Sequence, residues 1–389
     1  MPSDHLKVWH AIGPMEMGGA EVMIMELMRH KSADIDVTFL VHCRDSYLAG
    51  SAHFDQEIQA LGGAIAPITT PMQSGVLAYL EAFKDHIAQH GTPDVIHIHL
   101  NARSGLVAVA AALHKIPRII VHSHAEITFR GTWRYRILAQ LELLISRVLF
   151  TFLATHLWAC SKPAFKSLFL PFSLRKQHRA IVPNAINVSP YIMAMQKAGA
   201  ITNKAASDQP RPLVIGTVGR IVRHKNVLFL IAVCSLLRRR GTAVELRIVG
   251  REAESDYADK IRAAIAADGL EDCVYLMGER GDIPGQMAGF DVFASPALKE
   301  GFGIVAIEAQ AAGKACVLST GFPPAVDMGL NLVDFVEQYD TEMWADAIMQ
   351  ASVRDPVDSA QIDQAFQNSG FSIETSVKIV EHAWRGYER

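Results

Sequence analysis

The stretch Glu300-Gly-Phe-Gly-Ile-Val-Ala-Ile-Glu308 is the most informative part of this chain, because it combines two carboxylates with a glycine loop. The first carboxylate lies next to the glycines, and the second falls in an apolar run, Ile304–Ala312, that predicts a helix. The flanking runs Asp291–Ser295 and Ala315–Ser319 predict strands, and Gly313 ends the helix. A strand, a glycine loop and a helix in this order direct free backbone N–H groups at phosphate or sugar oxygens. We interpret this stretch as a binding-site candidate.

Length and composition predict a soluble α/β protein with two domains. The 389 residues exceed the usual size of a single core, and half of them are hydrophobic while a fifth are charged. The first residues contain no apolar segment of signal-peptide length, so export is not expected. Scattered cysteines without a metal-ligand spacing predict buried free thiols and a reducing, cytoplasmic setting. They are Cys43, Cys160, Cys234, Cys273 and Cys316.

Apolar runs alternate with helical patterns in both halves of the chain, which is typical of parallel sheets covered by helices on both faces. The predicted strands of the first half are Val8–Ile12, Val37–Val41, Val95–His99, Ile119–His122, Leu157–Cys160 and Ala180–Val182. Those of the second half are Leu213–Val218, Glu245–Val249, Val274–Met277, Val292–Ala294 and Ala315–Leu318. The predicted fold class is therefore α/β, with two Rossmann-like doubly wound domains.

A polar segment with prolines at its end, Ala198–Pro212, is interpreted as the linker between these domains. We place the first domain at residues 1–200 and the second at 201–372, with a ligand crevice at the carboxyl ends of the strands. The last segment, Ile373–Tyr387, has a helical pattern. The helix of residues 373–389 is expected to pack back on the first domain.

Two cations follow the first strand of the second half. The strand ends at Gly219 and delivers Arg220, and Lys225 stands five residues later. A guanidinium and an ammonium in one loop can hold a diphosphate, the first bidentately and the second as a point charge. The alternative is a pair of solvated surface cations. Their place in the same half as Glu300 and Glu308 favours the diphosphate.

Two further candidates lie in the first half. Gly13–Glu21 follows the first strand and opens a helix, so it suits close approach of an anion, with a simple turn as the alternative. It lacks the Gly-x-Gly-x-x-Gly spacing of a dinucleotide site. His122 and His124 end a strand and therefore point to the crevice, and Asn184 follows another strand. Two such histidines also suit a metal, but no third ligand stands at a recognisable spacing, so no metal is expected.

Taken in order, these features resemble the motif series of glycosyltransferase family 4. The series comprises Gly18-Gly-Ala-Glu21, His122-Ser-His124, Cys160-Ser-Lys162, Val182-Pro-Asn184, Val218-Gly-Arg220 with Lys225-Asn226, Gly278, and Glu300-Gly-Phe-Gly303 through Glu308-Ala309. The resemblance covers about residues 8–318. It implies the GT-B fold, in which two Rossmann-like domains face a cleft. It also implies transfer of a sugar from a nucleotide diphosphate, with retention of configuration and without a divalent metal.

The resemblance implies a role for each candidate residue. Arg220 and Lys225 would hold the donor diphosphate, and Glu308 would accept hydrogen bonds from the ribose hydroxyls. His124 would lie near the reacting centre, and Gly19 close to the diphosphate. The chemistry of the residues agrees, because cationic side chains and backbone donors can stabilise the charge that develops on a leaving phosphate without a metal.

The remaining implied contacts involve Glu300 and mainly backbone, and they reach the donor sugar or its phosphates. The backbone set is Gly278, Gly301, Phe302, Gly303 and Ile304. One departure from the family is Ala185, which replaces the glycine of a common Pro-Asn-Gly turn. Because alanine tolerates positive φ poorly, this turn is expected to differ slightly.

Residues 127–180 are strongly basic, although the whole chain has a net charge of −3. Within them Ile137–Trp158 carries an apolar stripe that charged residues interrupt, so it falls short of a membrane span. A basic, apolar stretch suits an anionic membrane surface or a lipid-linked acceptor, with a core helix and solvated cations as the alternative. Nucleic acid is not expected as a partner. The cations are Arg130, Arg134, Arg136, Arg147, Lys162, Lys166, Arg175, Lys176 and Arg179, against one acid, Glu142.

The sequence therefore predicts a retaining, metal-independent glycosyltransferase with no cofactor. Its donor is a nucleotide-diphosphate sugar, with UDP favoured only by its frequency in the family. Its acceptor is a sugar or a lipid-linked sugar in cell-surface polysaccharide assembly, such as a capsule or exopolysaccharide. We expect a cytoplasmic enzyme that docks weakly on the inner face of the plasma membrane. A nucleotide-sugar epimerase or a phosphorylase of the same architecture, or a non-catalytic nucleotide-sugar-binding module, remain alternatives.

Overall fold

The computed structural model describes residues 5–16, 18–43, 50–127, 129, 131–172, 177–204 and 211–387. Contacts between Cα atoms divide the chain into two compact units. Unit 1 comprises Met1–Ile186 with Ile373–Arg389, and unit 2 comprises Asn187–Ser372. The boundary expected near residue 200 therefore lies after Ile186. The polar segment was misleading because its first residues belong to helix α8 (Ser189–Lys204), which packs on α11 (Ile283–Ala288) within unit 2.

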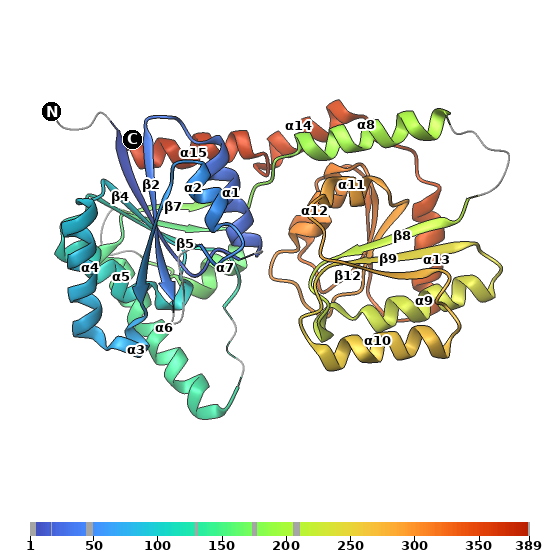
Figure 1. Cartoon of the computed structure of the whole chain (residues 1–389), viewed down its shortest axis with the longest axis horizontal. Coiled ribbons are helices and arrows are strands. Elements are labelled where there is room, and N and C mark those ends of the chain that lie inside the picture. Colours follow the sequence, from blue (N-terminus) through green and yellow to red (C-terminus); the bar gives the residue numbers. More distant parts are fainter. Residues whose placement is uncertain are drawn as a thin grey trace. The chain divides into compact units, whose positions relative to one another are not determined.

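Unit 1 contains a parallel sheet of seven strands in the order β3-β2-β1-β4-β5-β6-β7 (Figure 1). The strands are β1 (Leu6–Ile12), β2 (Ile35–Cys43), β3 (Ala64–Thr69), β4 (Val95–Ile98), β5 (Arg118–Ser123), β6 (His156–Ala159) and β7 (His178–Ile181). One face is covered by α4 (Val76–His90), α5 (Ser104–Leu113), α6 (Trp133–Leu153) and α7 (Lys162–Leu168). The other is covered by α1 (Gly19–His30), α2 (Asp55–Ala60) and α15 (Ile373–Arg385). Short turns α3 (Pro71–Ser74) and η1 (Asn101–Arg103) complete the unit.

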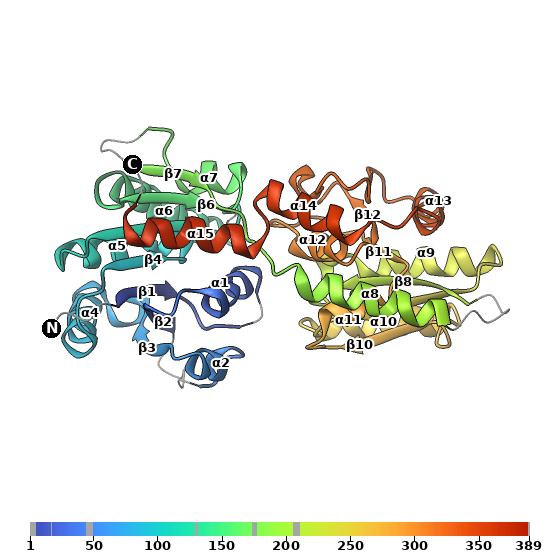
Figure 2. The ribbon, with the colours of Figure 1, turned by 90° about the horizontal axis from the view of Figure 1, so that it is seen from above.

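The C-terminal helix α15 belongs to unit 1, where it lies along the sheet beside α1 (Figure 2). Ile373 at its start donates its N–H to the carbonyl of Ile186 at 3.0 Å. Trp384 near its end is buried in the same core as the strands. Arg385 pairs with Asp34 at 2.7 Å. These contacts return the end of the chain to the first unit, so the two units share two chain crossings.

Unit 2 contains a parallel sheet of six strands in the order β10-β9-β8-β11-β12-β13. The strands are β8 (Leu213–Val218), β9 (Val244–Val249), β10 (Val274–Gly278), β11 (Val292–Ser295), β12 (Ala315–Ser319) and β13 (Val333–Val336). One face packs against α9 (Val227–Arg239), α10 (Ser255–Ala267) and α13 (Thr341–Ser352), and the other lies under α8, α11, α12 (Ile304–Ala311) and α14 (Ser359–Ser369). The turns η2 (Arg223–Lys225) and η3 (Pro324–Val326) follow β8 and β12.

The strands that the sequence predicted are all present, and the two that it missed, β3 and β13, are edge strands. β3 contains Pro67, which cannot donate to a ladder, and most of β13 is only partly buried. Pro67 in β3 and Asp334 in β13 thus interrupt the continuous apolar run that identified the other edge strands, β7 and β10, and the central strands. The five cysteines, all within the described residues, are buried, as predicted, and lie outside any disulfide.

Candidate active site

Three glycines stand at the carboxyl ends of three adjacent strands of unit 2. Gly219 follows β8, Gly250 follows β9 and Gly278 ends β10, with φ of 144°, 145° and 68°. A Cβ atom at Gly250 would lie 2.0 Å from the carbonyl oxygen of Gly219, so no larger residue fits there. These three strand ends therefore carry no side chains of their own, so a ligand can approach their backbone closely. The sequence analysis did not single out Gly250, although it follows its strand as Gly219 does.

Lys225 and Glu300 form an ion pair over this edge, between Nζ and Oε1. Their side chains are only 17% and 11% exposed. Lys225 Nζ also lies 3.3 Å from the point that a Cβ on Gly219 would occupy, so the ammonium covers the end of β8. Arg220 follows Gly219 directly; its residue is exposed, and it has no ion pair in the described ranges. The structure thus brings together Lys225 and Glu300, which the sequence had singled out separately, at Gly219, the predicted end of a strand.

The loop that carries Glu300 is held by backbone hydrogen bonds to two neighbouring segments. The N–H of Leu298 donates to the carbonyl of His224 in η2 at 2.7 Å. The N–H of Glu300 donates to the carbonyl of Gly321, after β12, at 2.9 Å. Gly301 follows as an exposed residue. These bonds fix the position of the Glu300 carboxylate relative to η2, so the ion pair does not depend on two flexible side chains alone.

Helix α12 begins at a glycine whose backbone conformation would be strained for a residue with a Cβ atom. Gly303 is its N-cap with φ of 85°, and a Cβ there would lie 2.4 Å from the ring of Phe322. Phe302 is buried and stacks on Phe371 with ring centroids 5.2 Å apart, so it offers a ligand only its backbone. Ile304 opens the helix, whose first N–H groups have no partner within it and suit an anion.

Glu308 lies one turn further along α12. Its Oε1 accepts a hydrogen bond of 2.8 Å from the hydroxyl of Tyr191, on α8. Burial raises the pKa of Glu308 to about 7, although the Tyr191 hydroxyl favours the ionised form. A carboxylate can accept up to four hydrogen bonds, so capacity for two ligand hydroxyls remains. Tyr191 was not a predicted site residue, because a contact between residues 117 apart leaves no local pattern in the sequence.

Gly19, the candidate of unit 1, is the first residue of α1, which follows β1. The space that a Cβ on Gly19 would occupy is open. A Cβ on Gly18 would instead lie 2.2 Å from the Oε2 atom of Glu21, whose carboxylate folds back over the N-cap. The amino end of α1 is therefore accessible at Gly19.

His124 follows β5, and both of its ring nitrogens are hydrogen-bonded. Nδ1 bonds the Oδ1 atom of Asn184 at 2.8 Å, and Nε2 bonds Nδ1 of His99 at 2.7 Å. Nε2 of His99 in turn bonds Nδ1 of His10 at 2.9 Å. Because Asn184 Oδ1 can only accept, His124 and His99 each donate through Nδ1 and accept through Nε2, and His10 donates through Nδ1. Ala185 in the following turn does not have a positive φ, so the missing glycine causes no strain.

His124 belongs to a layer of imidazoles on the sheet face under α1 and α15. Ring contacts join this layer to Trp158 and Trp384. Burial lowers the pKa of His10 to about 3 and that of His124 to about 4, and holds the others buried at the centre far below the usual value. These central rings are therefore neutral at pH 7. The layer comprises His10, His97, His99, His122, His124, His156 and His178.

Two triplets in this layer place nitrogens within 4.8 Å of one another, His10-His97-His99 and His99-His122-His124. A third imidazole therefore does lie beside His122 and His124. It is His99, directly after β4, and the sequence spacing did not reveal it. Neutral imidazoles are the form that binds metal. However, both triplets require His99, whose two nitrogens are already hydrogen-bonded, and neither includes a carboxylate to balance a buried divalent charge. The geometry therefore favours the hydrogen-bonded chain over a metal centre.

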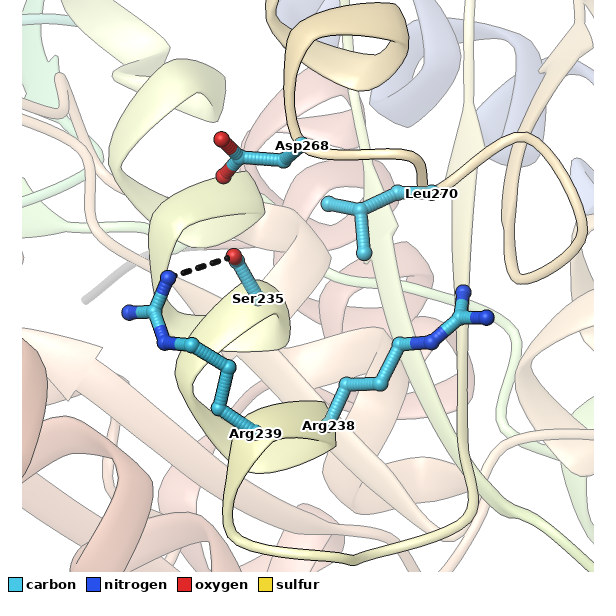
Figure 3. A pocket seen from close by; sticks show the side chains of 5 residues that line it. All are labelled: Ser235, Arg238, Arg239, Asp268 and Leu270. Carbon is cyan, nitrogen blue, oxygen red and sulfur yellow. Dashed lines mark hydrogen bonds between the residues drawn. The ribbon is translucent and has the colours of Figure 1, made fainter.

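Two surface hollows of unit 2 lie at the opposite, amino-terminal edge of its sheet. The first, of about 250 Å³, is lined by the C-terminal turn of α9 and the residues after α10, with Arg239 bonded to Ser235 at 3.1 Å (Figure 3). The second, of about 230 Å³, lies beside Asp291 and Lys314, before β11 and β12. Open parallel sheets bind their ligands at the carboxyl ends of the strands. We therefore assign neither hollow to the donor.

Helix α6 of unit 1 is apolar on both sides. Ala139, Leu143 and Phe150 are buried against the core. The opposite face is open to solvent, and the first turns of the helix project beyond the rest of the unit (Figure 1). The alternative of a fully buried core helix is therefore wrong for this face. Its exposed side chains are Trp133, Tyr135, Ile137, Leu138, Leu141, Leu144, Ile145, Val148 and Phe152.

The cations predicted around α6 have different roles. Arg134 and Arg136 are exposed on its first turns, and Lys162 and Lys166 are exposed on α7. Arg147 donates to the carbonyl of Ser167 at 2.7 Å, and Arg179 donates to the carbonyl of Pro171 at 3.0 Å, so these two are structural. Arg130, Arg175 and Lys176 lie outside the described residues. None of the described helices is long and apolar enough to cross a membrane.

Family models match most of both units. Residues 18–185 match a glycosyl transferase 4-like domain, and residues 212–352 match the glycosyl transferases group 1. The solved structure of Anabaena Alr3699/HepE in complex with UDP superimposes with a TM-score of 0.75 at 19% identity, covering 98% of this chain and 100% of that one. This likeness shows the fold, which is GT-B.

Three named proteins are similar to this chain in sequence. The putative glycosyltransferase EpsF of Bacillus subtilis is 29% identical over 97% of this chain and 96% of its own length. The capsular polysaccharide biosynthesis glycosyltransferase CapH of Staphylococcus aureus is 23% identical over 78% of this chain and 79% of its own. The UDP-Gal:alpha-D-GlcNAc-diphosphoundecaprenol alpha-1,3-galactosyltransferase of Escherichia coli is 24% identical over 58% and 57%. With these relatives, the ordered motifs and the GT-B fold, the chain belongs to glycosyltransferase family 4.

Proposed function

We propose that this glycosyltransferase takes its sugar from a nucleotide diphosphate bound at the carboxyl edge of the unit 2 sheet, and that it retains the anomeric configuration. The observation that carries the proposal is the Lys225–Glu300 pair over Gly219, at an edge of bare backbone. Lys225 and Arg220 supply positive charge for the diphosphate. Glu308, one turn into α12, accepts from the ribose hydroxyls. The backbone of Gly278 and of Gly301 to Ile304 lies at the same edge.

Donor cleavage builds negative charge on the leaving phosphate and positive charge on the anomeric carbon. Lys225, Arg220 and the first N–H groups of α12 can stabilise the phosphate charge, so we propose that no divalent metal is needed. A bound diphosphate would share Lys225 with Glu300, which leaves the Glu300 carboxylate able to accept from the donor sugar. Retention then follows a same-face route in which the leaving phosphate takes the proton of the acceptor hydroxyl.

His124 and Gly19 supply the proposed contacts from unit 1. Gly19 offers an open approach to the amino end of α1. His124 is proposed near the reacting centre as a neutral imidazole, because burial lowers its pKa to about 4. Both of its nitrogens are bonded in the described structure, so a contact with substrate requires exchange of the hydrogen bond to Asn184 or to His99.

We propose a UDP-sugar as donor and a lipid-linked sugar of a capsule or exopolysaccharide as acceptor. The UDP named for the Anabaena structure and the diphosphoundecaprenol named for the E. coli relative support these two classes. The exposed apolar face of α6 adds an independent argument for a lipid, because Trp133 and Tyr135 stand beside Arg134 and Arg136 on its first turns. Aromatic and cationic side chains together suit the surface of an anionic membrane. We therefore propose a cytoplasmic enzyme that docks reversibly through α6.

Release of nucleoside diphosphate tests the transferase proposal. The chain is incubated with UDP-, GDP- and ADP-sugars and a polyprenyl-diphosphate-linked sugar, and the anomeric configuration of the product is read by NMR. We expect acceptor-dependent release of UDP and retained configuration. Lys225→Ala should lose activity, whereas Lys260→Ala, an exposed lysine on α10, should keep it. Conversion of the donor without an acceptor would indicate an epimerase, and binding without turnover would indicate a non-catalytic module.

Co-sedimentation with liposomes tests the docking surface. We expect binding to anionic vesicles at low salt and loss of binding at high salt, since each cation near the surface contributes about 1 kcal/mol within about a Debye length. Leu141→Glu should weaken pelleting. Val353→Glu, at an exposed apolar position of unit 2, is the matched control and should not. Equal, negligible pelleting in every condition would favour a soluble acceptor.

A further inference from the structure

Tyr191 is the fifth residue of unit 2, and its side chain is buried at the start of α8. Its hydroxyl donates to Glu308 Oε1 at 2.8 Å. Glu308 is the one ionisable residue of α12, and its second oxygen, Oε2, has no hydrogen bond among the described residues. One oxygen of the carboxylate is thus held by the protein, while the other is left for a ligand.

We propose that Tyr191 is a positioning residue for the donor nucleotide, because its hydroxyl holds the Glu308 carboxylate in the orientation that accepts the ribose hydroxyls. This inference rests on the proposed role of Glu308 as the ribose ligand. Tyr191 acts through Glu308 and does not touch the nucleotide. A free glutamate side chain samples several rotamers, and fixing one of them before binding lowers the entropy cost of ribose recognition.

The hydroxyl also affects the charge of Glu308. Burial raises the pKa of Glu308 to about 7, and the hydrogen bond from Tyr191 opposes this rise. The elements packed against α12 are α8, α11, α14, η3 and β12. Among their described side chains only Lys197 on α8 and Asp363 on α14 are charged, and neither contributes to the raised pKa. Removal of the hydroxyl should therefore raise the pKa of Glu308 further, and the neutral acid accepts fewer hydrogen bonds from a diol.

Two variants separate this role from simple packing. Tyr191→Phe removes the hydroxyl and keeps the ring. Tyr275→Phe is the matched control, because it removes an exposed hydroxyl that donates to the carbonyl of Asp272 at 2.7 Å on β10. Thermal unfolding of both variants should stay close to that of the parent chain, since neither change opens a cavity larger than one oxygen atom.

The experiment is a calorimetric cycle with UDP and 2′-deoxy-UDP as probes at pH 7.5. We expect Tyr191→Phe to weaken UDP binding by about three- to tenfold and Tyr275→Phe to leave it unchanged. Loss of the 2′-hydroxyl should weaken binding by about tenfold in the parent chain but by only about threefold in Tyr191→Phe. Equal losses in both proteins would overturn the inference, because the hydroxyl would then act independently of the ribose.

Titration of UDP at different pH gives a second readout that packing alone would not change. Affinity in the parent chain should fall as the pH falls through about 7, and in Tyr191→Phe this fall should begin at a higher pH. The phosphate of UDP titrates in the same way in every variant, so only the difference between variants is used. If Glu308→Gln weakens binding while Tyr191→Phe matches the parent, the positioning role fails and the donor site stands. If the parent binds none of UDP, GDP and ADP, the donor site itself fails.

Discussion

Unit 1 holds fifteen of the sixteen histidines of the chain, whereas unit 2 holds only His224. At the carboxyl edge of the unit 1 sheet the polar groups are neutral imidazoles bonded to one another, such as His99 and His124. At the same edge of unit 2 they are a Lys225–Glu300 ion pair, glycine backbone and Glu308. Two sheets of similar topology therefore differ at this edge, where unit 1 carries neutral side chains and unit 2 carries charged ones. The unit 2 edge offers the cations Arg220 and Lys225 to an anion, whereas the central imidazoles of the unit 1 edge are neutral at pH 7.

Acidification should produce the largest effect, a loss of stability in unit 1 that unit 2 does not share. The pKa of His10, His42 and His124 is lowered by burial to about 3, 4 and 4 in the folded chain. Their stabilising contribution is complete above the unfolded value of 6.5 and is lost as the pH falls toward the folded values. Between pH 7.5 and 5 each of these histidines lowers the stability of unit 1 by about 2 kcal/mol, so the three together should lower it by on the order of 6 kcal/mol. Protection factors from hydrogen exchange in β6 and in β12, corrected for the slower intrinsic exchange at pH 5, measure this at pH 7.5 and 5. An equal loss of protection in both strands would contradict the comparison.

Glu308→Gln should sharpen the comparison, because it changes activity and pH dependence in unit 2 alone. Glutamine keeps the shape but halves the acceptor capacity, so kcat/KM should fall by about 2–4 kcal/mol. The folded pKa of Glu308, about 7, lies above its unfolded value, so stability is present at low pH and is lost as the pH rises through 7. The variant should therefore lose less stability between pH 5 and 8 than the parent. A folded variant with unchanged kcat/KM would remove Glu308 from the donor site.

Arg220→Ala and Lys225→Ala test the charge of the unit 2 edge. Each cation is present both in the ground state and when the phosphate leaves, so each change should weaken UDP binding as well as turnover, by about 1–3 kcal/mol. Lys225→Ala should cost more at a given salt concentration, because it also leaves Glu300 without its ion-pair partner. Calorimetric titration with UDP measures the affinity of both variants, with Lys260→Ala as the control. Parent-like affinity in both variants would remove the phosphate clamp from this loop.

Chelation of divalent metal ions should have the smallest effect on activity. If cationic side chains replace a divalent ion, activity in excess EDTA should match that in its absence. Loss of turnover, restored by Mg²⁺ or Mn²⁺, would contradict metal independence. Restoration by Zn²⁺ alone, together with loss of activity in His97→Gln, would instead direct attention to the His10-His97-His99 triplet.

Most of the fold could be predicted because central parallel strands and their glycine ends leave local patterns. Two of the four edge strands, β3 and β13, could not, since Pro67 and Asp334 interrupt their short apolar runs. Lys225 and Glu300 were predicted separately as site candidates, and their assembly over Gly219, the predicted end of a strand, required the structure.

The parts of the site that escaped prediction depend on contacts distant in sequence. The hydrogen-bonded series from His10 through His99 to His124 joins β1 to the residues that directly follow β4 and β5, and only strand order brings them together. Tyr191 reaches Glu308 from a segment that the expected boundary near residue 200 had placed in the first domain. The exposure of α6 was open for another reason, because both its faces are apolar and periodicity cannot tell which one is buried.

Hydrogen exchange with and without UDP tests the central claim most directly, because it locates the nucleotide on the chain without assuming a donor sugar. We predict slower exchange in residues 216–226 and 298–308 of unit 2, and unchanged exchange in β4 and β6 of unit 1. The segment 18–21 should slow as well if Gly19 lies close to the diphosphate. Saturating UDP that leaves both unit 2 segments unchanged, or that protects only the histidine strands, would contradict the assignment of the donor site to unit 2.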